Sequence, residues 1–148
     1  DDVWTSREAQ DGWDMMWRRT AERFRARANV AGYLLMVEPN ANQAAPGPDG
    51  GDLDQWDPAL LAEQVAGTPA DWPALARRLS AVIREHDTET PILINPDGFG
   101  HSRFAGLLDL NSAPGIVLAL HDYSPRGAPG SILNSARRSL YRRMRRAG

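Results

Sequence analysis

The sequence predicts an α/β fold, in which parallel strands are joined by crossover helices. Segments with a helical spacing of apolar residues alternate with three short apolar runs, and this alternation is typical of parallel sheets. Glycine and proline cluster at 46–51, 95–100 and 124–130. Each cluster follows an apolar run and precedes a helical pattern, which indicates connecting loops.

The chain is expected to begin with a helix and a strand. Apolar residues recur at helical spacing from about Asp11 to Ala28, and charged residues fill most of the other positions. The aromatic and methionine side chains of this helix fit core packing better than a ligand-binding box. The run 30–36 is apolar on both faces, which is typical of a strand buried in a parallel sheet.

A long loop at 40–57 precedes two predicted helices. Asp57 and Pro58 form an N-cap signal for a short helix that extends to Ala66. The segment 68–71 repeats this signal in an arrangement close to a capping box, and a second long helix follows. His86 lies near the C-terminal end of that helix, where the helix dipole favours a cation, and we interpret it as structural.

The last third of the chain contains two more predicted strands. The apolar runs 90–95 and 115–120 predict buried strands, and a brief helix is expected between them at 102–110. A final helix is expected from about Ser131, with apolar residues on one side and paired arginines elsewhere.

Length and composition limit the classes of protein to consider. The 148 residues allow one modest domain, 1–148, and 42% hydrophobic with 24% charged residues is typical of a soluble globular protein. No apolar run approaches the roughly 18 residues that span a bilayer, so we expect no membrane span, and no targeting peptide is visible. The chain has no cysteine and only three dispersed histidines, so we expect no metal site.

Charge is distributed unevenly along the chain. Residues 1–122 hold all 19 acidic residues and 10 of the 17 arginines, a net charge of −9, whereas residues 123–148 hold seven arginines and no acid. Arginines on one helix can neutralise the phosphates of a nucleic acid. Little aromatic interleaving for base stacking accompanies them, so we favour a solvated helix face and expect no nucleic-acid partner.

Polar residues follow each of the three predicted strands. Glu38 ends the first strand, Asn95 the second, and His121 and Tyr123 the third. In parallel α/β folds, ligands bind at the carboxyl ends of the strands, so we expect these side chains to share one cleft. A partly buried carboxyl at this position can donate a proton near neutral pH. An ion pair with an arginine at the sheet rim is the alternative for Glu38.

The other candidate residues also allow two interpretations. His121 and Tyr123 face the same way along an extended segment, where they can hydrogen-bond a polyhydroxylated ligand or cap the strand end. Asn95 precedes a proline and suits a turn as well as a ligand contact. Trp56, in a loop rich in glycine and aspartate, can stack on a sugar ring or anchor the loop to the core.

Three segments of the chain together resemble the cellulase-type glycoside hydrolases, family 5 of clan A. Residues 30–40, Val-Ala-Gly-Tyr-Leu-Leu-Met-Val-Glu-Pro-Asn, resemble the strand-four segment of that family, which ends in Asn-Glu-Pro. Residues 115–125, with His-Asp-Tyr, resemble the strand-six segment, which ends in His-x-Tyr. Residues 74–94 resemble the helix and strand between them.

The resemblance implies a fold, a reaction and roles for named residues. It implies a partial (β/α)8 TIM barrel, about strands four to six, and retaining hydrolysis of O-glycosyl bonds in a secreted enzyme that acts on β-linked polysaccharide without a cofactor. Glu38 matches the general acid/base, and His121 and Tyr123 match residues that line the sugar-binding cleft. We expect Asn95 and Trp56 to be further substrate contacts.

Two departures from the family pattern limit the expected activity. Val37 stands where the family has an Asn that hydrogen-bonds the sugar 2-hydroxyl. The nucleophile that ends strand seven has no counterpart after Asp122, and a barrel needs roughly 250 residues. We therefore expect an interior portion of a barrel that is inactive without the remainder. The alternative is a non-catalytic carbohydrate-binding remnant of the same fold.

Overall fold

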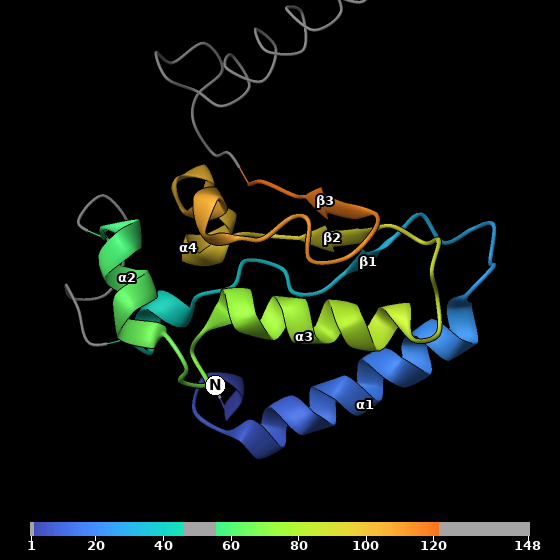
Figure 1. Cartoon of the computed structure of the whole chain (residues 1–148), viewed down its shortest axis with the longest axis horizontal. Coiled ribbons are helices and arrows are strands. Elements are labelled where there is room, and N and C mark those ends of the chain that lie inside the picture. The colour runs from blue at the N-terminus through green and yellow to red at the C-terminus, as the bar shows by residue number, and fades with distance from the viewer. Residues whose placement is uncertain (1, 46–55, 122–148) are drawn as a thin grey trace, which may run out of the picture.

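A three-stranded parallel sheet packed on two long helices forms the centre of the structure (Figure 1). The computed structural model describes residues 2–45 and 56–121. The predicted helix from Ser131 and the candidate Tyr123 lie outside the described residues. The helices and strands, in chain order, are η1 (Asp2–Trp4), α1 (Arg7–Phe24), β1 (Tyr33–Leu34), η2 (Ala41–Gln43), α2 (Pro58–Val65), α3 (Trp72–Arg84), β2 (Ile92–Ile94), α4 (Asp97–Gly100), η4 (Ser102–Leu107) and β3 (Ile116–Leu118).

The strands run in parallel in the order β1-β2-β3, which confirms the predicted fold class. Leu34 of β1 is in register with Leu93 of β2, and Leu93 with Val117 of β3. Each strand is shorter than the apolar run that predicted it, because the runs continue beyond the residues that form the hydrogen-bonded ladder.

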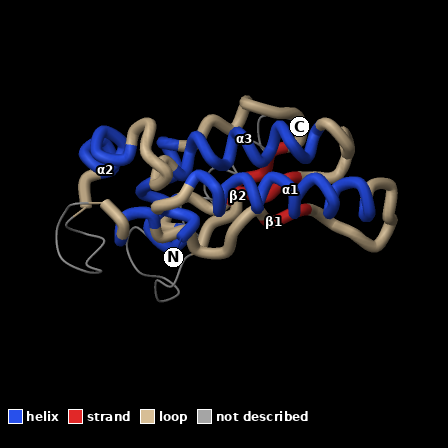
Figure 2. The backbone as a smooth tube through the Cα atoms, turned by 90° about the horizontal axis from the view of Figure 1, so that it is seen from below, coloured by secondary structure: helices blue, strands red, loops and turns tan. Residues whose placement is uncertain are grey.

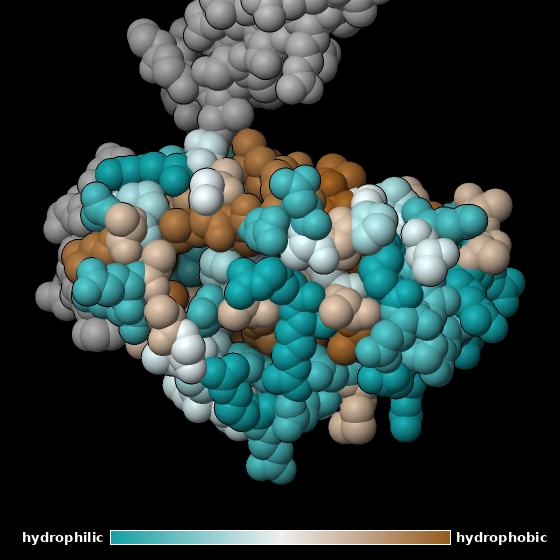
Figure 3. All heavy atoms as spheres, in the orientation of Figure 1, coloured by the Kyte–Doolittle hydropathy of each residue, from teal (hydrophilic) through white to brown (hydrophobic). Residues whose placement is uncertain are grey.

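Helices α1 and α3 lie side by side on one face of the sheet (Figure 2). The strand side chains that point toward these helices, such as Tyr33 and Ile92, are buried. The Tyr33 ring lies edge-on to Trp17 of α1, with 6.1 Å between the ring centroids. On the opposite face, Leu34 is 37% and Val117 46% exposed, and hydrophobic surface gathers over the strands (Figure 3). The expectation that the first strand is buried on both faces is therefore wrong, because helices of the described chain cover only one of them.

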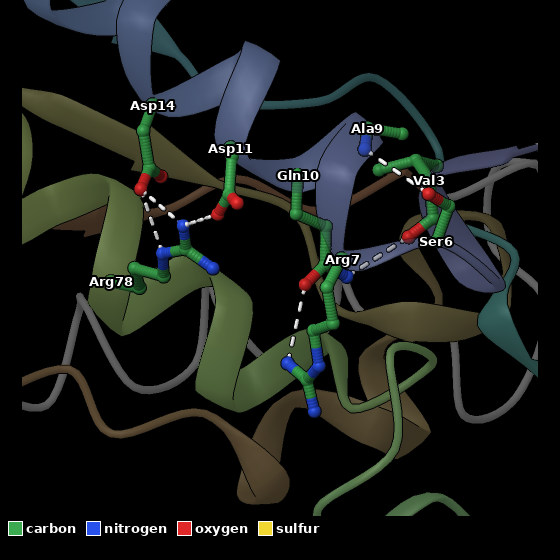
Figure 4. Close-up of polar contacts among 8 residues, drawn as sticks. All are labelled: Val3, Ser6, Arg7, Ala9, Gln10, Asp11, Asp14 and Arg78. Atoms are coloured by element: carbon green, nitrogen blue, oxygen red, sulfur yellow. Dashed lines mark hydrogen bonds and ion pairs between the residues drawn. The ribbon is translucent and has the colours of Figure 1, made fainter.

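Polar side chains fix the start of α1 and its packing on α3. Ser6 is the N-cap and accepts a hydrogen bond from the Ala9 N–H at 3.2 Å, so the helix begins four residues before the predicted start. The Arg78 guanidinium of α3 donates to Asp14 of α1 at 2.8 Å and also contacts Asp11 (Figure 4). These ion pairs connect the solvent-facing edges of the two helices.

The predicted start of α2 is confirmed, and that of α3 is displaced. Asp57 caps α2 by accepting hydrogen bonds from the N–H groups of Ala59 and Leu60. The cap of α3 is Asp71, which accepts from the Ala74 N–H at 3.0 Å. Thr68 instead forms the preceding turn, where its hydroxyl donates to a backbone carbonyl and accepts from a backbone N–H.

His86 lies two residues after the end of α3 and contacts α1. Its ring lies 3.2 Å from the Arg18 guanidinium and 3.5 Å from the Glu22 carboxylate, both on α1. These contacts join two packed helices, as the structural interpretation of His86 requires.

A buried carboxylate ties β1 to the loop after α3. The Tyr33 hydroxyl donates to Asp87 Oδ2 at 2.8 Å, and the other carboxylate oxygen accepts from the N–H groups of Glu89 and Thr90. Burial opposes the charged form, but the hydrogen bonds from Thr90, Tyr33 and Glu89 together outweigh it and lower the pKa of Asp87 to about 2.

The connection from β2 to β3 contains little regular helix. The predicted loop at 95–100 forms the tight turn α4, and the predicted helix at 102–110 is the 3-10 helix η4, whose Phe104 is fully buried. Across the part of the chain that the structure describes, no helix is both long and apolar enough to cross a membrane.

Candidate active site

Glu38 and His121 form a close pair at the carboxyl end of the sheet. Glu38 follows β1 and His121 follows β3, and Nδ1 of His121 lies 2.7 Å from Oε1 of Glu38. Because β2 lies between β1 and β3, this contact passes over the end of the central strand. The two side chains are 30% and 29% exposed, so the pair is partly shielded yet reachable from solvent.

The Glu38 backbone adopts a conformation that non-glycine residues rarely take. Its φ is +51°, in the left-handed region. This conformation costs roughly 1–2 kcal/mol for a residue with a Cβ, and it persists only where the surrounding structure imposes it. Strained backbone of this kind is concentrated at functional sites.

The turn α4 (Asp97–Gly100) is hydrogen-bonded to His121 and to Pro39, the residue after Glu38. Its Phe99 N–H donates to the carbonyl of Pro39, and its Gly100 carbonyl accepts from the His121 N–H at 3.0 Å. A Cβ added to Gly100 would lie 3.2 Å from the His121 side chain, so an alanine there would require that side chain to move by a few tenths of an ångström. The φ of Gly100 is +80°, which also favours glycine.

Asp97 is the one buried carboxyl of the described residues that lies beside this pair, and sequence reasoning missed it. The residue is 3% exposed and accepts hydrogen bonds from the backbone N–H groups of Gly98, Asn42 and Ala41. Burial disfavours its charged form more than these bonds favour it, and raises the pKa of Asp97 to about 6. Its place between a proline and a glycine after a strand was the signal that marked this turn.

Asn95 is fully buried and forms hydrogen bonds at the carboxyl ends of the strands. Its side-chain Nδ2 donates to the Ala119 carbonyl at 2.8 Å, and its own carbonyl accepts from the Trp72 indole N–H at 2.8 Å. The Asn95 side chain thus holds β2 to the segment after β3 and has no exposed surface for a ligand.

Trp56 lies in the hydrophobic core and is 2% exposed. An indole that stacks on a sugar needs an open ring face, which this burial removes. The structure therefore corrects the expected sugar contact in favour of the loop anchor. Val37, where the resembling family has Asn, is 62% exposed.

The candidate site combines a carboxyl group and an imidazole that lie within hydrogen-bond distance of each other. At 30% exposure the Glu38 carboxyl can be reached from solvent, and carboxyl groups in such positions can serve as general acids or bases in enzymes. Within residues 2–45 and 56–121, no group of three or more His, Asp or Glu side chains is arranged to hold a metal ion.

Comparison with known proteins finds similarity in the fold. No family model and no curated protein matches the sequence. A solved glycoside hydrolase matches with a TM-score of 0.56 and 22% identity, over 83% of this chain and 30% of that chain. The cellulose synthase subunit Z (CcsZ) of Clostridioides difficile matches with a TM-score of 0.58 and 17% identity, over 84% of this chain and 34% of that chain.

These similarities show a glycoside hydrolase-like fold, of which this chain spans about a third of the neighbours' length. The three parallel strands with their helices are compatible with part of a TIM-like barrel. At such identities the likeness concerns the fold alone.

Proposed function

We propose that this chain carries the acid/base half of a glycoside hydrolase active site, with Glu38 as the proton donor. The observation that carries the proposal is the 2.7 Å contact between Glu38 and His121 across the carboxyl ends of the sheet. Ligands of parallel α/β folds bind at this end of the strands. The glycoside hydrolase-like fold supports the same assignment.

In this proposal the two side chains have different tasks. The His121 ring holds the Glu38 carboxyl in one orientation. Glu38 donates its proton to the glycosidic oxygen as the bond to the anomeric carbon breaks, so that the leaving sugar departs as an alcohol. In a second step, Glu38 removes a proton from the water that releases the bound sugar.

The retaining mechanism also needs a carboxylate nucleophile about 5–5.5 Å from the acid/base. Asp97 is unsuited to this task, because it is buried and engaged by three backbone N–H groups. We propose that the nucleophile comes from the remainder of a barrel. The exposed row of Leu34 and Val117 supports this, because barrel interiors are filled by side chains of this kind from all strands.

The proposed substrate is a β-linked polysaccharide, as the resemblance to cellulase-type family 5 of clan A implies, and a secreted protein suits a polymeric substrate. We keep His121 and Tyr123 as proposed sugar contacts. Val37 cannot donate a hydrogen bond to the 2-hydroxyl. Losing such a contact typically lowers the rate on the order of 10²–10³-fold.

Leaving-group dependence tests the role of Glu38 in the protein that carries this chain. A general acid matters for a poor leaving group and little for an acidic phenol. We expect Glu38→Gln to slow release of a sugar leaving group by about 10²–10⁴-fold and to slow cleavage of a dinitrophenyl glycoside far less. Glu63→Gln, at an exposed position on α2, is the matched control. Equal losses on both substrates would refute the proton-donor role.

A non-catalytic carbohydrate-binding protein is the second candidate. The exposed Val37, in place of a hydrogen-bonding Asn, favours it. Calorimetry with β-linked gluco- and manno-oligosaccharides separates the two. Binding without any hydrolysis by the protein that carries this chain supports the second candidate, whereas turnover that depends on Glu38 supports the first.

A further inference from the structure

One turn is hydrogen-bonded to the segments of both Glu38 and His121. The Phe99 N–H donates to the carbonyl of Pro39, the residue after Glu38, at 2.9 Å. The neighbouring Gly100 accepts at its carbonyl from the His121 N–H at 3.0 Å. Two adjacent residues of α4 therefore set the separation of the two backbones that carry the pair.

Asp97 fastens the same turn to the Glu38 segment at a second point. Its carboxylate accepts from the N–H groups of Ala41 and Asn42, which begin η2, and from its own neighbour Gly98 at 2.7 Å. The segment after Glu38 is thus held at Pro39 by Phe99 and at Ala41 and Asn42 by Asp97. These contacts hold the chain directly after Glu38, the residue whose backbone is strained.

The turn itself is under backbone strain and needs such support. Gly98, Phe99 and Gly100 have φ values of +62°, +61° and +80° in succession. Phe99 has a Cβ, so its left-handed conformation is unfavourable on its own. Because Asp97 caps the first N–H of the turn, its loss releases both the turn and the η2 segment.

We propose that Asp97 is a positioning residue, which acts through the turn Asp97–Gly100 to hold Glu38 and His121 in contact. The catalytic meaning of this inference rests on the proposed function, but the geometric claim does not. Asp97 touches no substrate in this account.

The His121 ring reports the pair directly in NMR spectra. Long-range coupling between ring nitrogens and ring protons shows which nitrogen carries the proton, and a carboxylate at Nδ1 favours the proton on Nδ1. The chain has only three histidines, so the ring signals can be assigned by single substitutions. Glu38→Gln gives the reference pattern for a pair without the carboxylate.

We expect Asp97→Ala and Gly100→Ala to shift the His121 ring pattern most of the way to that of Glu38→Gln. Asp97→Asn keeps one acceptor oxygen and should give a smaller shift. Asp109→Ala is the matched control, because Asp109 accepts a backbone N–H in an exposed turn and should leave His121 unchanged. In the active protein, Asp97→Ala should lower kcat on poor leaving groups by about 10–100-fold, with partial recovery in Asp97→Asn.

The inference is overturned if Asp97→Ala keeps the parent signal of His86, which reports that α1 and α3 are still packed, and also keeps that of His121. Should Asp97→Ala fail to fold, Asp97→Asn decides, and an unchanged His121 pattern in that folded variant also overturns it. The NMR experiment requires no sugar. A shifted His121 pattern in a protein that hydrolyses nothing therefore upholds the positioning role while contradicting the proposed function.

Discussion

The carboxyl group of Glu38 contacts the imidazole of His121 over the end of β2, the strand that lies between β1, which Glu38 follows, and β3, which His121 follows. The contact, 2.7 Å between Oε1 and Nδ1, joins residues 83 positions apart in the sequence. Parallel topology makes this possible, because the carboxyl ends of all three strands lie at one edge of the sheet.

Strain at Glu38 predicts an unusual ranking of two substitutions. Both Glu38→Ala and Glu38→Gly remove the contact with His121, but only glycine relieves the left-handed backbone, whose φ is +51°. We expect Glu38→Gly to unfold with a free energy about 1 kcal/mol higher than Glu38→Ala in urea titrations. As a control, alanine should be at least as stable as glycine at Glu8, within α1. Equal stability of the two Glu38 variants would contradict the strain.

The pKa of Asp97, raised by burial to about 6, predicts a pH dependence of stability. The folded state holds the proton more tightly than the unfolded state, whose pKa is near the ordinary value of 3.8. The contribution of the protonated Asp97 to the free energy of unfolding is therefore fully present below about pH 4. It falls by about 3 kcal/mol as the pH rises through about 6. Above about pH 7 it stays constant.

Urea titrations of the parent and Asp97→Asn between pH 4 and pH 7 check this prediction. The difference in unfolding free energy between the two proteins should change across that interval, because Asn does not titrate. If the unfolding free energies of the parent and Asp97→Asn differ by the same amount from pH 4 to pH 7, Asp97 has an ordinary pKa in the folded protein.

The hydrogen bond from Tyr33 to Asp87 predicts that removal of one hydroxyl group lowers the free energy of unfolding markedly. Tyr33→Phe removes the hydroxyl from a buried carboxylate and should lower the free energy of unfolding by about 1.5–3 kcal/mol at pH 7. Thr20→Ala removes a hydroxyl bonded to a helix carbonyl at an exposed position and should change it by less than about 0.5 kcal/mol. A decrease in unfolding free energy of less than about 0.5 kcal/mol for Tyr33→Phe would mean that the other hydrogen bonds to Asp87 are sufficient to stabilise its carboxylate.

The elements could be predicted from the sequence where local chemistry specifies them. The cap Asp57, the amphipathic pattern of α1 and the three apolar runs gave the helices and the parallel sheet. The open face of β1 could not be predicted, because an apolar run does not show which segments cover it. The start of α3 was displaced because Thr68 and Asp71 are both capping residues, and tertiary contacts select between them.

The sequence allowed the pair of Glu38 and His121 to be predicted, but not Asp97, which holds the neighbouring turn. Glu38 and His121 follow apolar strands, so their convergence follows from topology alone. Asp97 escaped notice because its partners, the N–H groups of Ala41 and Asn42, lie more than 50 positions away. Trp56 was open to two interpretations, and only its burial of 98% distinguishes the loop anchor from a sugar platform.

The isolated 148-residue chain is expected to release no reducing sugar from β-linked glucan or mannan. The proposed mechanism requires a carboxylate nucleophile that the remainder of a barrel would supply. The measurement is a reducing-sugar assay at high protein concentration, with the protein that carries this chain as the positive control. Release by the isolated chain that Glu38→Gln abolishes would contradict the requirement for the remainder.

Azide rescue of Glu38→Ala, in the protein that carries this chain, tests the central claim most directly. Without its acid/base, a retaining enzyme accumulates a glycosyl ester, and azide attacks the anomeric carbon without needing a base. From a dinitrophenyl β-glycoside, we predict faster turnover with azide and a β-glycosyl azide as product. An α-glycosyl azide would make Glu38 the nucleophile, and a Glu38→Ala protein that keeps full activity and forms no azide product would contradict any acid/base role for Glu38.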